Sequence, residues 1–271
     1  MTKKIKTLIL RTAGTNCDAE TARAFTLVGA TAELVHINRL IKSKSLLSKY
    51  HILAIPGGFT YGDDLESGTI LANEINYALK KELAEFIKDG KIIIGICNGF
   101  QVLTRMGILP DTNAEFSKPN AKMQAALGLN NSAKFESRWV YLKKEPVETK
   151  CVWTTEMPEI IYLPVAHGEG KFIPKDETIF KAMEKNRQIV LRYADETGGF
   201  ANGQYPLNPN GSTRDIAGVT DKTGRVFGLM PHPERHVVFT QHPNWRRGIP
   251  KEKMGTGLQI FQNGVNFVKK I

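Results

Sequence analysis

A continuous apolar run, Ile92–Ile96, has the length of a single β-strand and leads directly into Cys97. A second run of this kind, Ile52–Ile55, is stopped by Pro56-Gly57-Gly58. Strands without alternating polar positions are buried on both faces, which is typical of a parallel sheet covered by helices. These runs therefore predict an α/β fold with Cys97 at the carboxyl end of a central strand, where ligands bind in such sheets.

Helical patterns separate the expected strands of the first half, and the second half is richer in strands. The expected strands are Ile5–Leu10, Ala32–Ile37, Ile52–Ile55, Ile92–Ile96, Trp139–Leu142, Ile160–Leu163, Ile189–Tyr193, Ile216–Val219 and Val226–Met230. Helices are expected at 18–29, 69–88 and 257–269, and directly after Cys97. Alternating strands and helices imply right-handed crossovers. We predict a doubly wound, mostly parallel sheet flanked by helices, with extra strands in the second half.

The chain length of 271 residues permits one large domain or two small ones. Because the sequence shows no linker, repeat or low-complexity segment, we predict a single domain over residues 1–271. No apolar run reaches the roughly 18 residues of a membrane span, so no membrane association is expected.

Three cysteines, Cys17, Cys97 and Cys151, are too few and too irregularly spaced for a disulfide framework or a zinc site. A reducing compartment follows, and we expect the protein to be cytoplasmic. At least one thiol is then free for chemistry, and Cys17 and Cys151 are interpreted as structural thiols.

The formal net charge is +10, and part of it is concentrated between Arg235 and Ile271. This segment contains seven Lys or Arg residues and a single acid, Glu252. One interpretation is a solvated basic surface, and the other is a docking surface for an acidic partner or a phosphorylated substrate. Nucleic acid is not expected as a partner, because no aromatic stacking series is interleaved with the basic residues.

The segment Gly95-Ile96-Cys97-Asn98-Gly99 matches the sharp turn that carries a nucleophile between a strand and a helix. A helix N-terminus favours negative charge, and the thiolate is the reactive form of cysteine. The N–H of Asn98 would point toward an oxyanion formed by attack of Cys97 on a carbonyl. The alternative is an inert thiol at the end of a core strand.

His232 lies just after an expected strand, in Met230-Pro231-His232-Pro233-Glu234. A carboxylate two residues away can hold the imidazole in one tautomer. Taken alone, the segment could be a surface loop. Joined with the cysteine turn, it predicts a catalytic triad of Cys97, His232 and Glu234.

A second oxyanion donor is expected from Gly58, which follows the strand next to that of the nucleophile. Glycine there would let a backbone N–H approach the substrate closely, although an ordinary turn is also consistent with the pattern. The chain contains no G-x-x-x-x-G-K-[ST] loop of the kind that binds nucleotide phosphates.

The two central motifs, Gly-Ile-Cys-Asn-Gly-Phe-Gln at 95–101 and Pro-His-Pro-Glu at 231–234, resemble those of class I (triad) glutamine amidotransferases. Further segments narrow the match to the glutaminase subunits of phosphoribosylformylglycinamidine synthase. These segments are 14–18, 56–64, 138–140, 166–170 and 208–212.

The resemblance implies a flavodoxin-like fold and a subunit that frees ammonia from glutamine through Cys97. It also implies a large synthetase subunit and a small bridging subunit as partners, with ATP and Mg²⁺ bound by the partner and no cofactor or metal in this chain. By the same analogy, glutamine would be bound by Gln101, His167, Gly168 and Glu169. Asp63 and Asp64 would lie beside the site and contact the partner.

Three alternatives remain open. The chain could serve another synthetase, such as one for CTP or GMP, although Ala-His-Gly-Glu-Gly at 166–170 argues against this. A stand-alone cysteine hydrolase or chaperone of related fold would often lack Pro-His-Pro-Glu. A catalytically silent binding subunit would not be labelled at Cys97 by a glutamine-analogue alkylator.

Overall fold

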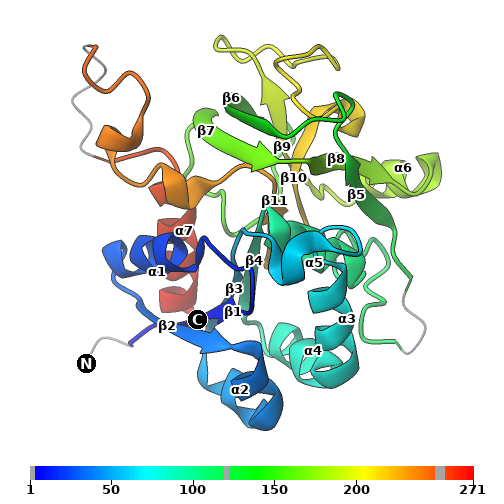
Figure 1. Cartoon of the computed structure of the whole chain (residues 1–271), viewed down its shortest axis with the longest axis vertical. Helices are drawn as coiled ribbons and strands as arrows, with labels where there is room; N and C mark the ends of the chain where they lie inside the picture. The colour runs from blue at the N-terminus through cyan, green and yellow to red at the C-terminus, as the bar shows by residue number, and fades with distance from the viewer. Residues whose placement is uncertain (1–3, 119–121, 248–253) are drawn as a thin grey trace.

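The computed structural model describes residues 4–118, 122–247 and 254–271, and Figure 1 shows their arrangement. Within these residues, nine strands form one sheet in the order β2-β1-β3-β4-β11-β10-β9-β6-β7. The strands are β1 Lys6–Arg11, β2 Thr31–His36, β3 Ile52–Ile55, β4 Ile92–Ile96, β6 Glu136–Lys144, β7 Ile160–His167, β9 Ile189–Ala194, β10 Ile216–Thr220 and β11 Val226–Leu229. The pairs from β2 to β11 are parallel, and those from β11 to β7 are antiparallel. The predicted doubly wound sheet with extra strands in the second half is confirmed, and its parallel part consists of the five strands from β2 to β11.

Helices cover both faces of the parallel strands (Figure 1). α1 Asp18–Leu27 and α7 Leu258–Lys270 lie on one side, and α3 Thr69–Ala78, α4 Lys80–Lys88 and α5 Asn98–Arg105 lie on the other. Phe25 on α1 is fully buried and packs edge-to-face on Phe261 of α7, with ring centroids 5.0 Å apart. Such helix pairs bury the parallel strands on both faces, as their apolar sequences require.

The expected helix over 69–88 is wrong in one respect, because two helices, α3 and α4, occupy this range. Leu79 separates them with non-helical dihedral angles (φ −133°, ψ 7°), and its side chain is buried. A straight helix of 20 residues would be about 30 Å long, whereas a five-residue strand such as β4 spans only about 17 Å. The break lets both halves remain against the sheet.

Several elements were not expected from the sequence. They are α2 Ile37–Lys42, β5 Ala125–Leu129, β8 Glu169–Pro174 and α6 Glu177–Lys185. β5 and β8 pair with each other in a separate two-stranded sheet. α6 has a local signal, since Asp176 caps it by accepting a hydrogen bond from the N–H of Ile179 at 2.9 Å. No helix in the described part of the chain is long and apolar enough to cross a membrane.

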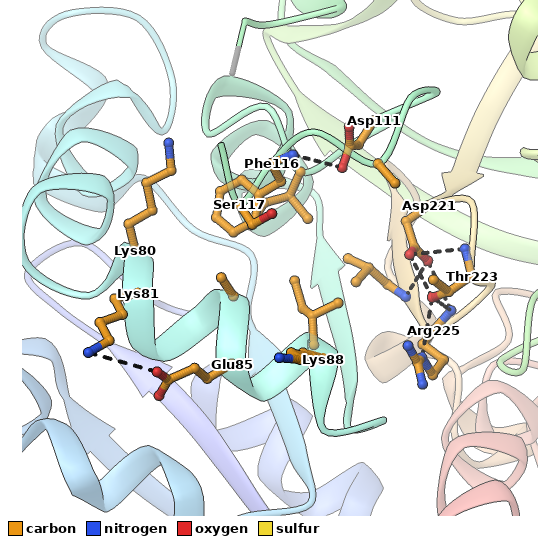
Figure 2. A pocket seen from close by; sticks show the side chains of 15 residues that line it. Lys80, Lys81, Glu85, Lys88, Asp111, Phe116, Ser117, Asp221, Thr223 and Arg225 are labelled. Atoms are coloured by element: carbon orange, nitrogen blue, oxygen red, sulfur yellow. Dashed lines mark hydrogen bonds and ion pairs between the residues drawn. The ribbon is translucent and has the colours of Figure 1, made fainter. Parts of the chain in front are cut away.

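A cavity of about 620 Å³ lies between α4, residues 111–117 and the turn before β11 (Figure 2). Phe116 and Val226 contribute apolar walls, and Lys88 and Arg225 stand at its edge. Val226 is the first residue of β11. The cavity is therefore at the amino end of this parallel strand, whereas α/β sheets bind their substrates at the carboxyl ends.

Candidate active site

Cys97 stands at the turn between β4 and α5, and the glycines around it leave no space for side chains. Its φ is +50°, and its N–H donates to the carbonyl oxygen of Leu229 at 2.8 Å. A Cβ on Gly99 would lie 1.9 Å from the carbonyl oxygen of Ile55, and one on Gly95 would lie 2.6 Å from that of Gly99. The sharp turn predicted from the sequence thus depends on close backbone packing against the neighbouring strand.

The predicted acid–base pair emerges at the same edge of the sheet. β11 is parallel to β4, with Leu229 paired to Ile96. His232 follows β11 by three residues, and its N–H donates to the carbonyl oxygen of Pro164 at 2.8 Å. Its Nδ1 lies 2.6 Å from Oε1 of Glu234, and both side chains are buried. The structure therefore brings the proposed imidazole and carboxylate to the strand end that carries the cysteine.

Two opposing effects set the protonation of His232. Burial lowers its pKa and is the largest single effect, but the charges of Glu234 and Cys97 together raise the pKa well above the ordinary histidine value. Polar contacts of the ring with the sulfurs of Cys17 and Cys97 also raise the pKa of His232. Nδ1 is held by Glu234, so Nε2 is the nitrogen left for proton transfer. At neutral pH the ring is an imidazolium, which can donate a proton to a leaving group.

Both predicted oxyanion donors lie in this region. α5 begins at Asn98, so the N–H of Asn98 is one of the four at a helix N-terminus that have no intrahelical acceptor. Thr60 donates its hydroxyl to Oδ1 of Asn98 at 2.7 Å, which fixes the segment after Gly58 beside the helix. Gly58 has φ +147°, and a Cβ on it would lie 2.7 Å from the carbonyl oxygen of Gly14. Only glycine fits this position.

Gln101 and Glu169, predicted to bind glutamine, are engaged within the protein. Nε2 of Gln101 donates to the carbonyl oxygen of Glu169 at 2.6 Å, and its Oε1 accepts from Nδ2 of Asn98 at 2.9 Å. The carboxylate of Glu169 accepts from the N–H of Ser67 at 3.1 Å. These contacts join α5 to β8 beside the nucleophile, and the substrate-binding roles of the two residues stay predictions.

His167 is buried next to the catalytic pair. Burial, followed by the charge of His232, lowers the pKa of His167 to about 3, so this ring is neutral. Its Nδ1 lies 3.1 Å from Oδ1 of Asn130, and within the described residues its buried Nε2 has no hydrogen-bond partner. A Cβ on Gly170 would lie 2.4 Å from the His167 ring, whereas one on Gly168 would make only an ordinary contact, with Cδ2 of Phe135 at 4.0 Å. Binding of glutamine by His167 and Gly168 stays a prediction.

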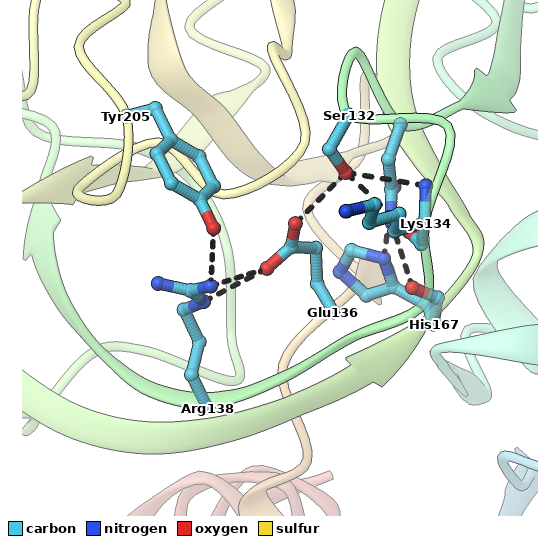
Figure 3. A network of polar contacts seen from close by, with 7 residues as sticks. Ser132, Lys134, Glu136, Arg138, His167 and Tyr205 are labelled. Atoms are coloured by element: carbon cyan, nitrogen blue, oxygen red, sulfur yellow. Dashed lines mark hydrogen bonds and ion pairs between the residues drawn. The ribbon is translucent and has the colours of Figure 1, made fainter.

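A polar network that the sequence did not reveal continues from His167 (Figure 3). Asn130 also donates to the carbonyl oxygen of His167 at 2.8 Å. Farther along, Glu136 accepts from Ser132 at 2.8 Å and forms an ion pair with Arg138 at 2.6 Å. Nη2 of Arg138 in turn donates to the hydroxyl of Tyr205 at 2.6 Å. The network joins the loop before β6 and the loop around 205 to one side of the site.

Cys17 and Arg235 also reach the site, although the sequence indicated a structural thiol at 17 and assigned no site role to Arg235. Sγ of Cys17 lies 3.9 Å from Nδ1 of His232 and accepts a hydrogen bond from Nη2 of Arg235 at 3.1 Å. Arg235 could have been suspected because it directly follows Glu234. Cys17 lies in the loop after β1, in segment 14–18 that resembles the family, and this position was the available signal.

Cys17, His232 and Glu234 offer a set of ligand atoms within 4.8 Å of one another, which is close enough for a metal ion. However, Nδ1 is already hydrogen-bonded to the carboxylate, and the guanidinium of Arg235 is 3.1 Å from the sulfur. A fixed positive charge at this distance opposes a divalent cation. The arrangement suits proton transfer better, and the absence of a metal stays a prediction.

Comparison with known proteins agrees with this geometry. Residues 4–268 match the family model of the CobB/CobQ-like glutamine amidotransferase domain. The phosphoribosylformylglycinamidine synthase subunit PurQ of Dehalococcoides mccartyi is 48% identical over 99% of both chains. The protein of the same name from Pyrococcus horikoshii is 35% identical, covering 98% of this chain and 100% of its own.

A solved structure described as PurLQS from Thermotoga maritima is similar to 98% of this chain and covers 99% of its own, with a TM-score of 0.69 and 29% identity. A GMP synthase subunit from Thermoplasma acidophilum covers 99% of this chain and 96% of its own at a TM-score of 0.55, but its 15% identity shows the fold alone. The chain therefore belongs to the CobB/CobQ-like glutamine amidotransferase family, among the PurQ subunits of phosphoribosylformylglycinamidine synthase.

Proposed function

We propose that this chain is the glutaminase subunit of phosphoribosylformylglycinamidine synthase. It hydrolyses glutamine to glutamate and ammonia, and a synthetase subunit uses the ammonia to convert formylglycinamide ribonucleotide to formylglycinamidine ribonucleotide. The observation that carries the proposal is the convergence of Cys97 with the buried His232–Glu234 pair at the ends of two adjacent parallel strands. Similarity to PurQ subunits along nearly the whole chain indicates which synthetase receives the ammonia.

In the first half-reaction, the thiolate of Cys97 attacks the side-chain carbonyl carbon of glutamine and forms a C–S bond. The carbonyl oxygen becomes an oxyanion, which accepts hydrogen bonds from the N–H groups of Gly58 and Asn98. Such donors are each worth about 10²–10³-fold in rate. His232 gives its proton from Nε2 to the amide nitrogen, the C–N bond breaks, and ammonia leaves a glutamyl thioester on Cys97.

In the second half-reaction, neutral His232 removes a proton from water, and the resulting hydroxide attacks the thioester. Collapse of this second tetrahedral intermediate breaks the C–S bond and releases glutamate and the Cys97 thiolate. Glu234 keeps Nδ1 protonated throughout, so that Nε2 alternates between acid and base. General acid–base catalysis of this kind contributes roughly 10²–10⁴-fold.

The product also explains the need for partners. Ammonia that reaches bulk water becomes ammonium, which is not a nucleophile, so the synthetase must dock over the site. We assign ATP and Mg²⁺ to that subunit and expect a small bridging subunit in the assembly, in agreement with the composite name of the Thermotoga structure. We place the complex in the cytoplasm, since all three cysteines are free and buried, as a reducing compartment favours.

Other synthetases are less well supported as partners. The solved relatives named for GMP synthase and for the CTP synthase glutaminase domain are 15% and 12% identical to this chain. At these identities only the fold is shared. The PurQ relatives, by contrast, match nearly the whole chain at 35–48% identity.

The proposal is tested with Cys97→Ala in a complex reconstituted with the synthetase and bridging subunits. Synthesis from glutamine should fall by at least about 10³-fold, because the covalent step is lost, while synthesis from added ammonium salts continues at the wild-type rate. Cys151→Ala, at another buried cysteine, serves as the control and should retain both activities. If the Cys97 variant lost both activities in an intact complex, or neither, the proposed role would be wrong.

A further inference from the structure

Cys17 is a buried thiol in contact with the catalytic imidazole, and the mechanism above does not use it. Only 1% of its surface is exposed. Its Sγ donates to Oδ1 of Asn16 at 3.1 Å and accepts from Nη2 of Arg235 at 3.1 Å, which leaves it directed at Nδ1 of His232 at 3.9 Å. Burial raises the pKa of this thiol more than the neighbouring groups lower it, so it is a neutral S–H at neutral pH.

The loop that carries Cys17 also holds the oxyanion turn. The N–H of Cys17 donates to the carbonyl oxygen of Gly57 at 3.2 Å, and Thr15 is bridged to Gly58. A Cβ on Gly57 would lie 2.7 Å from Cε1 of His232 and 3.2 Å from Sγ of Cys17. The thiol, the imidazole and the glycine turn are therefore packed against one another without intervening space.

This packing restricts tilting of the His232 ring, which the hydrogen bond to Glu234 alone would allow. The χ2 angle of histidine is broad, and a single hydrogen bond at Nδ1 allows the ring to tilt about that contact. Cys17 packs on the ring beside Nδ1. Arg235, the residue after Glu234, holds the sulfur in place by a hydrogen bond. A tilt of His232 would move Nε2 away from Cys97 and from the leaving nitrogen.

We propose that Cys17 is a positioning residue of the glutaminase site. Held by Arg235, it keeps the His232 ring directed toward Cys97 and packed against the turn that carries Gly58. Cys17 touches no reacting atom, so its effect passes through His232. The inference rests on the proposed glutaminase function and adds to it a fourth side chain that the triad requires.

The test compares Cys17→Ala and Cys17→Ser in the reconstituted complex, with Cys151→Ala as a matched control that removes an equally buried thiol. Cys17→Ala should lower kcat for glutamine by about 10–100-fold, as expected for a displacement of about 1 Å at a reacting group. The KM for glutamine and the ammonium-dependent rate should stay near wild type. Cys17→Ser should recover most of the loss, since a hydroxyl can donate to Asn16 and accept from Arg235.

Two further readouts separate positioning from simple stability. Cys17 helps to raise the pKa of His232, so the alkaline limb of the pH profile of kcat/KM should move to lower pH in Cys17→Ala. Arg235→Ala should lower kcat for glutamine by a similar factor. The double variant should have no lower kcat than either single variant, because both substitutions remove the same Arg235–Cys17 interaction.

A wild-type kcat and pH profile in Cys17→Ala would overturn the proposal. Equal loss of the glutamine- and ammonium-dependent activities in both Cys17 variants would also overturn it, since that pattern indicates a structural defect. Failure of the proposed function would be distinguishable, because the wild-type complex itself would then not use glutamine.

Discussion

Two buried histidines beside the nucleophile differ in protonation, and the difference comes from their neighbours. The carboxylate of Glu234 lies 2.6 Å from His232. Its charge and that of Cys97 together raise the pKa of His232 more than burial lowers it. His167 has only the neutral amide of Asn130 at Nδ1, and the positive charge of His232 disfavours a second cation. One positive charge, on His232, is thus kept beside the nucleophilic cysteine, and His167 adds no second one.

The neutral His167 should make folding sensitive to acid. Its pKa in the folded chain is about 3, below the ordinary value of 6.5. The unfolded chain therefore binds a proton that the folded chain does not, and this contribution to stability is lost as pH falls from about 6.5 toward 3. His167→Gln should remove a slope of up to about 1.4 kcal/mol per pH unit over this range.

Urea unfolding of both proteins between pH 7 and pH 4 measures this slope. His232, whose pKa is raised in the folded chain, contributes with the opposite sign, since its stabilisation is present at low pH and lost as pH rises. It is present in both proteins and cancels in the comparison. Parallel stability curves for wild type and variant would contradict the prediction.

At the scale of the element, the turn between β4 and α5 is fixed by backbone approach. Only Cys97 separates the end of β4 from the start of α5, and the helix packs directly on β3, so that a Cβ on Gly99 would collide with the carbonyl oxygen of Ile55. This contact is made with backbone, which cannot rotate away. The glycine is therefore a requirement of the fold as well as of the catalytic turn.

Gly99→Ala should lower the free energy of unfolding by at least about 2 kcal/mol, because the added methyl overpacks a rigid contact. Gly128→Ala in β5 is the matched control. The nearest atom to its added Cβ is Cδ1 of Ile173 at 3.5 Å, an ordinary contact. The control should stay within about 0.5 kcal/mol of wild type. Chemical denaturation measures both, and equal losses would show that the predicted collision does not decide stability.

At the scale of the whole molecule, large apolar side chains are exposed around the active-site edge. They are Phe59, Leu65, Leu129, Phe135 and Tyr205. The rings of Phe59 and Phe135 are 6.2 Å apart, and Leu129 pairs with Glu169 at the start of β8. Large exposed apolar side chains that gather on one side of a molecule mark interaction sites. We expect the synthetase subunit to cover this edge.

Replacing Phe135 and Leu129 together by Ser should weaken binding of the synthetase subunit by at least about tenfold, since each buried side chain of this size contributes about 1.5–3 kcal/mol. These side chains are 52% and 68% exposed in the free chain. Tyr77→Ser on α3, where 96% of the side chain is exposed, is the control. Calorimetric titration of the isolated subunits measures the affinities. Equal affinities for all three proteins would place the interface elsewhere.

Features that depend on neighbours in the chain could be predicted from the sequence. The apolar run before Cys97, the flanking glycines and the closely spaced His232 and Glu234 each specify a local conformation, and each is found as expected. Parallel strands end at one edge of a sheet, so the convergence of these segments could also be predicted.

The other groups that meet at that edge could not be predicted, because they come from segments far apart in the chain. The placement of Cys17 against His232 and the engagement of Gln101 by Glu169 join segments that are 215 and 68 residues apart. The break at Leu79 between α3 and α4 likewise was not expected from the sequence. Local sequence sets dihedral angles and periodicity, whereas strand order and register, fixed by burial of the entire sheet, set the contacts between distant loops.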